Sequence, residues 1–203
     1  MIQAEEPRLV LASSSATRRG LMEAAGLRFS AEAAAVDEAA IKEAAQAEGL
    51  SATDAALLLA DAKAMRIARR NPESLVIGAD QLLVCKERWF DKPADPTAAR
   101  EHLLALRDRA HELVTAVVCW RHGARIWQHV AVPRLVMRAF SESFLDDYLA
   151  VEAERVTSSV GAYRLEGMGM HLFSRIDGEH AAILGLPMLA LLGFLRDHGV
   201  LAR

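Results

Sequence analysis

Two patterns of apolar residues alternate along the chain: short continuous runs typical of strands, and longer segments with the spacing of a helix. Together they predict an α/β protein. Short runs of strand-forming residues predict strands at 8–12, 31–35, 75–79, 82–85, 111–120, 126–140 and 170–176. Longer segments with apolar positions three or four residues apart predict helices at 16–25 and 51–70, and others that begin after Asp95, after Ser141 and near Pro187. No internal repeat or linker separates these elements, so the chain is predicted to be one domain over residues 1–203.

The predicted strand segments at 75–79 and 82–85 flank one acid and one amide, Asp80 and Gln81. We interpret this stretch as a hairpin in which Asp80 stands at a strand end, with a polar turn following at 86–88. A carboxylate beside a buried strand is costly unless it is paired, hydrated or bound to a metal. Asp80 is therefore the first candidate for a catalytic residue.

Composition and charge narrow the class of protein. The 203 residues are 52% hydrophobic, which suits a folded chain with a full core. A net charge of -3 gives no reason to expect binding to nucleic acid or to an acidic membrane. No apolar run is long enough to span a bilayer, and Glu5 and Glu6 argue against a signal peptide. We therefore predict a cytoplasmic protein in which Cys85 and Cys119 are buried and reduced.

A serine cluster at 13–15 separates the first predicted strand from the first predicted helix. The N–H groups of a helix's first turn, together with the helix dipole, favour a bound anion. Arg18 and Arg19 lie in that turn, where the dipole disfavours cations, so they suggest a bound phosphate. A capped helix with solvated arginines explains the same pattern equally well.

Two further segments carry charged residues in informative positions. Lys63 is four residues from both Leu59 and Ile67, so it lies on an apolar helix stripe. It either faces a cleft or snorkels to the surface, and snorkelling is the commoner outcome. Asp37 and Glu38 follow a predicted strand, where they either bind a divalent cation or are solvated loop acids.

Several familiar sites are not supported. The glycine-rich segment at 161–169 has neither the spacing of a dinucleotide-binding loop nor the lysine of a P-loop. The seven histidines show no metal-ligand spacing, and the serines at 13–15 lack a nucleophile elbow. What remains is a set of arginines, lysines and carboxylates near the ends of predicted elements. Cations that hold phosphates, and acids that hold a metal and activate water, suit phosphoanhydride hydrolysis.

These residues belong to motifs that follow one another nearly from end to end of the chain. The motifs are Leu11-Ala12-Ser13-Ser14-Ser15-Ala16-Thr17-Arg18-Arg19, Val36-Asp37-Glu38, Ala62-Lys63-Ala64, Ile77-Gly78-Ala79-Asp80-Gln81, Lys92-Pro93, Gly161-Ala162-Tyr163 and Gly185-Leu186-Pro187. In this order they resemble the motifs of the Maf family of nucleoside triphosphate pyrophosphatases, also called septum formation inhibitor proteins. The resemblance implies an α/β fold with two lobes around a central mixed β-sheet flanked by helices, and an active-site cleft between the lobes.

The resemblance also implies an activity and the residues that carry it. The implied reaction hydrolyses a nucleoside triphosphate to the monophosphate and pyrophosphate in the cytoplasm, with Mg²⁺ or Mn²⁺ as cofactor. Asp80 matches the family's proton acceptor, and Glu38 and Asp80 would hold the metal. The positions that match phosphate-binding residues are Ser13, Arg18, Arg19, Lys63 and Lys92. The implied partner is a nucleoside triphosphate rather than a nucleic acid or a membrane, and a homodimer is left open.

Three positions bear on which base is recognised. Gln81, Glu166 and the run at 172–175 resemble the branch of the family that acts on 7-methyl-GTP, whereas other branches tend to carry glutamine at the position of Glu166. N7-methylation makes guanine positive, so a nearby carboxylate would favour it while accepting from its N1–H and its N2 amino group. Thr17 stands at a position associated with specificity, where that branch typically has tryptophan.

Other functions remain open as alternatives. The same residues are compatible with a Maf-type enzyme for dTTP and UTP or for a broad set of modified nucleotides. A non-catalytic nucleotide-binding regulator of septum formation is the alternative from another class. Binding alone would not need all of Glu38, Lys63, Asp80 and Lys92. An enzyme for 7-methyl-GTP would clear modified nucleotides, and the family's older name suggests a role in cell-division arrest.

Overall fold

Eight β-strands and seven α-helices form the regular structure of residues 2–203, the part of the chain that the computed structural model describes. The strands are β1 (Leu9–Leu11), β2 (Phe29–Ala31), β3 (Leu75–Cys85), β4 (Arg88–Phe90), β5 (Ala110–Arg121), β6 (Ala124–Ala131), β7 (Arg134–Met137) and β8 (Phe173–Asp177). The α-helices are α1 (Ala16–Ala24), α2 (Glu38–Ala47), α3 (Ala52–Ala68), α4 (Pro96–Leu106), α5 (Glu142–Glu152), α6 (His180–Ile183) and α7 (Met188–Asp197). Short 3-10 helices lie at η1 (Ala153–Thr157), η2 (Val160–Ala162) and η3 (Met168–Leu172).

The strands form a mixed sheet in the order β2-β1-β3-β5-β7-β8, with β4 paired to β3 and β6 paired to β5. β1 runs parallel to both of its neighbours, and Leu11 lies opposite Ala31 on β2 and Ile77 on β3. The pairs β3–β4, β5–β6, β5–β7 and β7–β8 are antiparallel. The predicted α/β class, with a mixed sheet flanked by helices, is confirmed.

The chain divides into two compact units. Unit 1 consists of Met1–Gln81, Thr115–Ala131 and Glu179–Arg203, and unit 2 consists of Leu82–Val114 and Val132–Gly178. The long strands β3 and β5 each contribute residues to both units.

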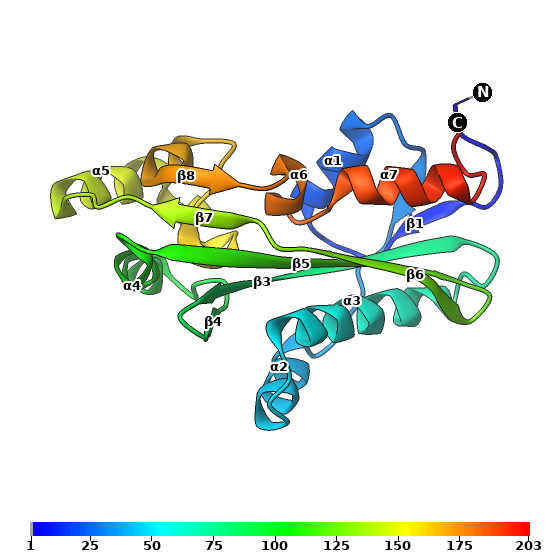
Figure 1. Ribbon diagram of the computed structural model, residues 1–203, viewed down its shortest axis with the longest axis horizontal. Helices are drawn as coiled ribbons and strands as arrows, with labels where there is room; N and C mark the ends of the chain where they lie inside the picture. The colour runs from blue at the N-terminus through cyan, green and yellow to red at the C-terminus, as the bar shows by residue number, and fades with distance from the viewer. Residues whose placement is uncertain (1) are drawn as a thin grey trace. The chain divides into compact units, whose positions relative to one another are not determined.

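Within unit 1, α1 and α7 cover one face of the strands and α3 covers the other (Figure 1). The core on the α1 side is built from Leu11, Met22, Ile77 and Leu191, all of which are fully buried. On the α3 side the helix approaches β3 closely, because Gly78 has no side chain. A Cβ atom at Gly78 would lie 2.7 Å from the Cβ of Ala64 on α3. This close approach determines which residues of α3 reach the middle of β3.

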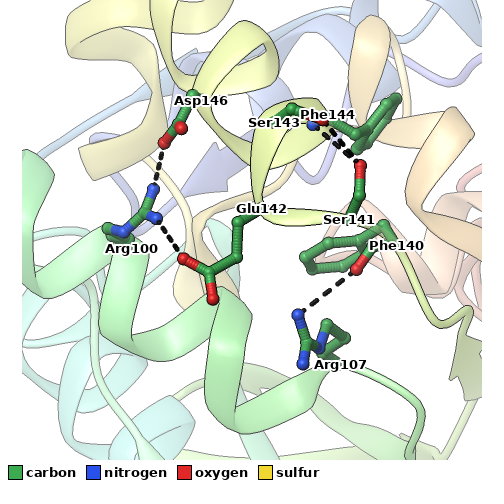
Figure 2. A network of polar contacts seen from close by, with 8 residues as sticks. All are labelled: Arg100, Arg107, Phe140, Ser141, Glu142, Ser143, Phe144 and Asp146. Atoms are coloured by element: carbon green, nitrogen blue, oxygen red, sulfur yellow. Dashed lines mark hydrogen bonds and ion pairs between the residues drawn. The ribbon is translucent and has the colours of Figure 1, made fainter.

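Within unit 2, α4 and α5 are linked by ion pairs on their exposed sides (Figure 2). Arg100 on α4 pairs with Asp146 on α5, and its second guanidinium nitrogen is 3.3 Å from Glu142. Ser141 caps α5 by accepting a hydrogen bond of 3.2 Å from the backbone N–H of Phe144. Exposed pairs of this kind stabilise a protein little, so these contacts orient the two helices more than they hold the unit together.

The helix starts that depended on local capping signals are confirmed. Ser15, Ser51, Asp95 and Ser141 each accept a backbone N–H bond at the N-terminus of α1, α3, α4 and α5, respectively. The two cysteines are also buried and free, as predicted. None of the helices between residues 2 and 203 is both long enough and apolar enough to cross a bilayer.

Three predictions on the secondary structure are wrong. The strand expected at 31–35 lies instead at β2, Phe29–Ala31, and the helix α2 that starts at Glu38 was not predicted. Asp37 caps that helix by accepting from Ala40 N, a signal that the alanine-rich surroundings concealed. The long strand expected at 126–140 is two strands, β6 and β7, because proline at 133 cannot donate to a strand ladder.

The third error concerns Asp80 directly. The stretch at 75–85 is one continuous strand, β3, so Asp80 and Gln81 lie within a strand and not at a strand end. The hairpin turn lies instead at Lys86 and Glu87, between β3 and the antiparallel strand β4. Both of these turn residues have positive φ angles, which is typical of tight hairpin turns.

Candidate active site

A lysine on α3 points inward and meets two acids. Lys63 Nζ lies 2.8 Å from Glu38 Oε1 and donates a hydrogen bond to Asp80 Oδ1. Only 9% of the Lys63 side chain and 7% of the Asp80 side chain are exposed. Burial of one such charge alone would be strongly unfavourable, so the ion pair is what allows both residues to be buried. Of the two alternatives left open for Lys63, the structure therefore shows the inward-facing one and not the commoner snorkelling.

Glycine at position 78 explains how Lys63 reaches Asp80. Gly78 and Asp80 are two residues apart on β3, so they share one face of the strand. The missing side chain at Gly78 lets α3 pack against that face, and Lys63, next to Ala64, is brought beside the carboxylate.

Glu38 completes the cluster from the first residue of α2 and leaves it partly open. Its side chain is 46% exposed, so one side of the cluster faces solvent. Partial burial raises the pKa of the Glu38 carboxyl, but the hydrogen bond and the charge of Lys63 lower it. Two further cations, Lys42 and Arg18, also lower this pKa, and the result lies below the usual value. Glu38 is thus ionised at neutral pH.

Arg18 joins the same site from the first turn of α1. Its Nε donates a hydrogen bond of 2.8 Å to the carbonyl oxygen of Gly185, and its Nη1 lies 3.4 Å from Ser13 Oγ. Burial lowers the pKa of the guanidinium, whereas the nearby charges of Asp80 and Glu38 raise it. Arginine remains protonated at neutral pH under such influences, so Arg18 is a second cation beside the two acids.

Gln81 follows Asp80 on β3, and its amide is occupied by contacts inside unit 1. Its Nε2 donates to Thr115 Oγ1 at 2.8 Å and to the carbonyl oxygens of Ala182 and Ile183 at 3.1 and 3.0 Å. Thr115, which is fully buried, donates in turn to the carbonyl oxygen of Ala182 at 3.0 Å. Gln81 therefore holds the short helix α6 to β3, and Thr115 holds it to β5.

The other predicted site residues of unit 1 lie on the exposed side of α1. Thr17 and Arg19 are both exposed. Arg19 lines an open cavity of about 470 Å³, together with Glu23, Leu27, Arg28, Phe29 and Ala31. Arg18 thus lies near the two acids and contacts Ser13. Within residues 2–203, no such contact links Thr17 or Arg19 to the acids.

Two predicted site residues, Lys92 and Glu166, belong to unit 2. Lys92 is exposed between β4 and α4. Glu166 is exposed in the turn that precedes η3, and the neighbouring Arg164 pairs with the buried carboxylate of Glu152 at 3.4 Å. Gly169 allows this turn to close, because a Cβ atom there would lie 2.7 Å from the backbone nitrogen of Arg164.

The acids of unit 1 also fit a divalent cation. Between residues 2 and 203 the structure contains no group of three or more histidine, cysteine, aspartate or glutamate side chains arranged to hold a metal. Glu38 and Asp80 nevertheless converge on the same ammonium group, so two carboxylates face one small volume. Mg²⁺ is commonly bound by one or two carboxylates together with substrate phosphates. The pair fits a cation that is held jointly by protein and substrate.

Sequence reasoning missed the buried polar residues that support the site. Thr115 was included in a run of apolar strand residues, and a hydroxyl inside such a run was the available signal. Glu152 and Arg164, which pair in unit 2, carried no signal because they are 12 residues apart and belong to different elements.

The chain matches a known protein family over most of its length. The family model described as Maf-like protein matches residues 8–198. The chain belongs to the Maf family. A protein of Granulibacter bethesdensis named nucleoside triphosphate pyrophosphatase is 55% identical over 194 residues, which cover 96% of this chain and 98% of that protein.

This member of the Maf family is similar to proteins named for two different activities. A nucleoside triphosphate pyrophosphatase of Rhodospirillum rubrum is 50% identical over 195 residues, covering 96% of each chain. A 7-methyl-GTP pyrophosphatase of Rhizobium meliloti is 46% identical over 196 residues, covering 97% of this chain and 98% of that protein. The predicted membership of the Maf family is therefore confirmed.

Proposed function

We propose that this Maf protein hydrolyses the bond between the α- and β-phosphates of a nucleoside triphosphate, with 7-methyl-GTP as its preferred substrate. The products are the nucleoside monophosphate and pyrophosphate. The observation that carries the proposal is the partly open cluster of Glu38, Lys63, Asp80 and Arg18 in a chain whose relatives bear the name nucleoside triphosphate pyrophosphatase.

Asp80 is suited to accept the proton from the attacking water. Its Oδ1 is bonded to Lys63, and general bases are held in this way by neighbouring groups. Water oxygen bonds to the α-phosphorus, the bond from that phosphorus to the bridging oxygen breaks, and pyrophosphate leaves. Lys63 and Arg18 stabilise the negative charge that develops on the phosphates.

The remaining phosphate-binding residues in the proposal are Ser13, Arg19 and Lys92. Ser13 lies within reach of the Arg18 guanidinium, at 3.4 Å, so a phosphate bound by one is accessible to the other. Arg19 and Lys92 are exposed and free to meet a ligand from solvent. Their participation rests on their match to the family motifs.

The enzyme is proposed to use Mg²⁺ or Mn²⁺, since Maf-family pyrophosphatases generally need a divalent cation. Glu38 and Asp80 would hold the cation, which when bound would neutralise charge on the triphosphate. Lys63 contacts both carboxylates, so the two acids are already held side by side where the cation would bind.

Selectivity for 7-methyl-GTP is proposed to depend on Glu166, with Gln81 and Thr17 as further specificity positions. An exposed carboxylate favours a positively charged base over neutral ones, and 7-methylguanine carries such a charge. Relatives named 7-methyl-GTP pyrophosphatase, such as the Rhizobium meliloti protein, support this choice of base.

A panel of nucleotides tests the proposal. Purified protein with Mg²⁺ or Mn²⁺ should release pyrophosphate from 7-methyl-GTP with a higher kcat/KM than from GTP, dTTP or UTP. Glu166→Gln should lower the preference for 7-methyl-GTP over GTP about tenfold. The matched control is Glu154→Gln, which changes another exposed glutamate of unit 2 and should leave the preference unchanged.

Two outcomes would contradict different parts of the proposal. Equal hydrolysis of all four nucleotides would reject the choice of base and leave the pyrophosphatase activity in place. Tight binding of an intact triphosphate in calorimetry, with no pyrophosphate released in the presence of metal, would reject catalysis in favour of a nucleotide-binding regulator.

A further inference from the structure

We infer that Thr115 and Gln81 are positioning residues that place Arg18 beside Asp80 through the short helix α6. We call the side chains of Gln81 and Thr115, together with the carbonyl oxygens of Ala182 and Ile183, the α6 clamp. This inference rests on the proposed pyrophosphatase function. It replaces the specificity role proposed for Gln81 with a positioning role, and it assigns a role to Thr115.

The clamp is a closed set of hydrogen bonds. The amide nitrogen of Gln81 has two hydrogens, and it faces three acceptors at 2.8, 3.0 and 3.1 Å. The hydroxyl of Thr115 accepts from Gln81 and donates to Ala182 O, so its donor and one of its acceptor sites are in use. Both amide hydrogens of Gln81 are thus committed inside the protein and are unavailable to a nucleotide base.

The α6 clamp is connected to Arg18 through the residues that follow α6 in the chain. Ala182 and Ile183 are the last two residues of α6, and Gly185 follows two positions later. The carbonyl oxygen of Gly185 accepts the 2.8 Å bond from Arg18 Nε. Gly185 has a φ angle of +100°, and a Cβ atom there would lie 3.2 Å from Arg18 Nε. A shift of α6 would therefore move the acceptor that orients the guanidinium.

The clamp also connects Arg18 to the strand that carries the proposed base. Asp80 and Gln81 are adjacent on β3, so their side chains point to opposite faces of the strand. Asp80 meets Lys63 of α3 on one face, and Gln81 meets Thr115 and α6 on the other. The position of Arg18 relative to Asp80 therefore depends on Gln81, the residue that follows Asp80 on β3.

The test compares variants that remove or keep the clamp hydroxyl. Thr115→Val has nearly the same shape and cannot hydrogen-bond, whereas Thr115→Ser keeps the hydroxyl. We expect Thr115→Val to lower kcat about tenfold for both 7-methyl-GTP and GTP, with little change in the ratio between them. Thr115→Ser should restore most of the loss. The matched control is Val117→Ala, which removes buried carbon two residues along the same face of β5 and should leave kcat unchanged.

A double-mutant cycle with Arg18 separates positioning from a general structural effect. If Thr115 acts through Arg18, Thr115→Val should cause no further loss of kcat in a protein that already carries Arg18→Ala. Should Thr115→Val fail to fold, Gln81→Leu takes its place in the cycle, because Gln81 is only partly buried. Thermal unfolding of each variant verifies that it is folded at the assay temperature.

The possible results decide the inference. Additive losses in the cycle, or a kcat for Thr115→Val equal to that of the unmodified enzyme, would overturn it. A loss confined to 7-methyl-GTP in Gln81→Leu would also overturn it, because that result requires direct contact with the base. An unmodified protein that releases no pyrophosphate from any nucleotide would overturn the proposed function, and this inference with it.

Discussion

Each of the two units buries a charged side chain, but the surroundings of that charge differ. In unit 1, Lys63 is shared by two carboxylates, and the Glu38 side chain is 46% exposed, so the cluster is open on one side. In unit 2, the Glu152 side chain is 4% exposed and pairs with Arg164, whose side chain is 28% exposed. The first arrangement leaves the Glu38 carboxylate open to solvent beside the buried pair, and the second closes a turn.

A second polar pair in unit 2 strengthens the contrast. His111 Nε2 lies 2.8 Å from the hydroxyl of Tyr163, and both residues are buried. Burial lowers the pKa of His111 to about 4 and raises that of Tyr163, so both groups are neutral near neutral pH. A buried, neutral pair of this kind is suited to a structural role. The partly open cluster of charged groups in unit 1 is suited to catalysis. The following predictions test that distinction.

The largest effect is expected at Asp80. Asp80→Asn removes the proposed proton acceptor and should lower kcat by about 10³-fold, within the range typical of general acid–base catalysis. Steady-state release of pyrophosphate measures the change. Asp61→Asn makes the same exchange in an aspartate that bonds Trp120 Nε1 at 2.7 Å elsewhere in unit 1, and it should keep nearly full kcat. Full activity in Asp80→Asn would remove that residue from the reaction.

Lys63→Met should have the next largest effect, on both stability and activity. Without the ammonium group, the carboxylate of Asp80 is buried with no cation bonded to it, which should lower the free energy of unfolding by about 3 kcal/mol. Urea unfolding measures the change, and Arg66→Met on the exposed side of α3 is the control. The double variant with Asp80→Asn should lose less stability than the sum of the two single variants. A simple sum would show that the two residues do not interact.

In unit 2, His111 should make stability depend on pH without affecting catalysis at neutral pH. The folded pKa is about 4 and the ordinary value is 6.5, so the unfolded chain binds the proton more tightly. Stability from the neutral histidine is therefore fully present above pH 6.5 and is lost as the pH falls toward 4.

Unfolding in urea at neutral pH and at about pH 4.5 measures this effect. The drop between the two conditions should be smaller by roughly 2 kcal/mol in His111→Gln than in the unmodified protein. His171→Gln, at an exposed histidine of the same unit, should leave the drop as it is. An identical drop in His111→Gln would show that His111 is not the group responsible.

The smallest effect is expected at Glu152. Glu152→Gln keeps the shape of the side chain but removes the charge that pairs with Arg164, and should lower the free energy of unfolding by roughly 1 kcal/mol. The kcat for GTP should stay within about twofold, because the change is not in the charge cluster of unit 1. A loss of kcat comparable to that of Asp80→Asn would erase the distinction between the two buried charges.

Local signals in the sequence were sufficient for much of the fold. The serine cluster at 13–15 and the single residues Ser51, Asp95 and Ser141 identified four helix starts, because a capping bond joins residues only three positions apart. The candidate acid, Asp80, was also found from its apolar surroundings. The alanine-rich run at 31–35 was less informative. A strand was predicted there, and the helix α2 that starts at Glu38 was not.

The sequence by itself determined which residues carry charge and which family their order belongs to, and the tertiary structure decided what those charges contact. The bond from Lys63 to Asp80 spans 17 positions, and that from Gln81 to Ile183 spans 102. Neither can be read from local spacing, because each depends on how closely a helix packs on β3. The close packing of α3 at Gly78 decides between the two orientations that local spacing left open for Lys63, and it makes that lysine the buried centre of the candidate site.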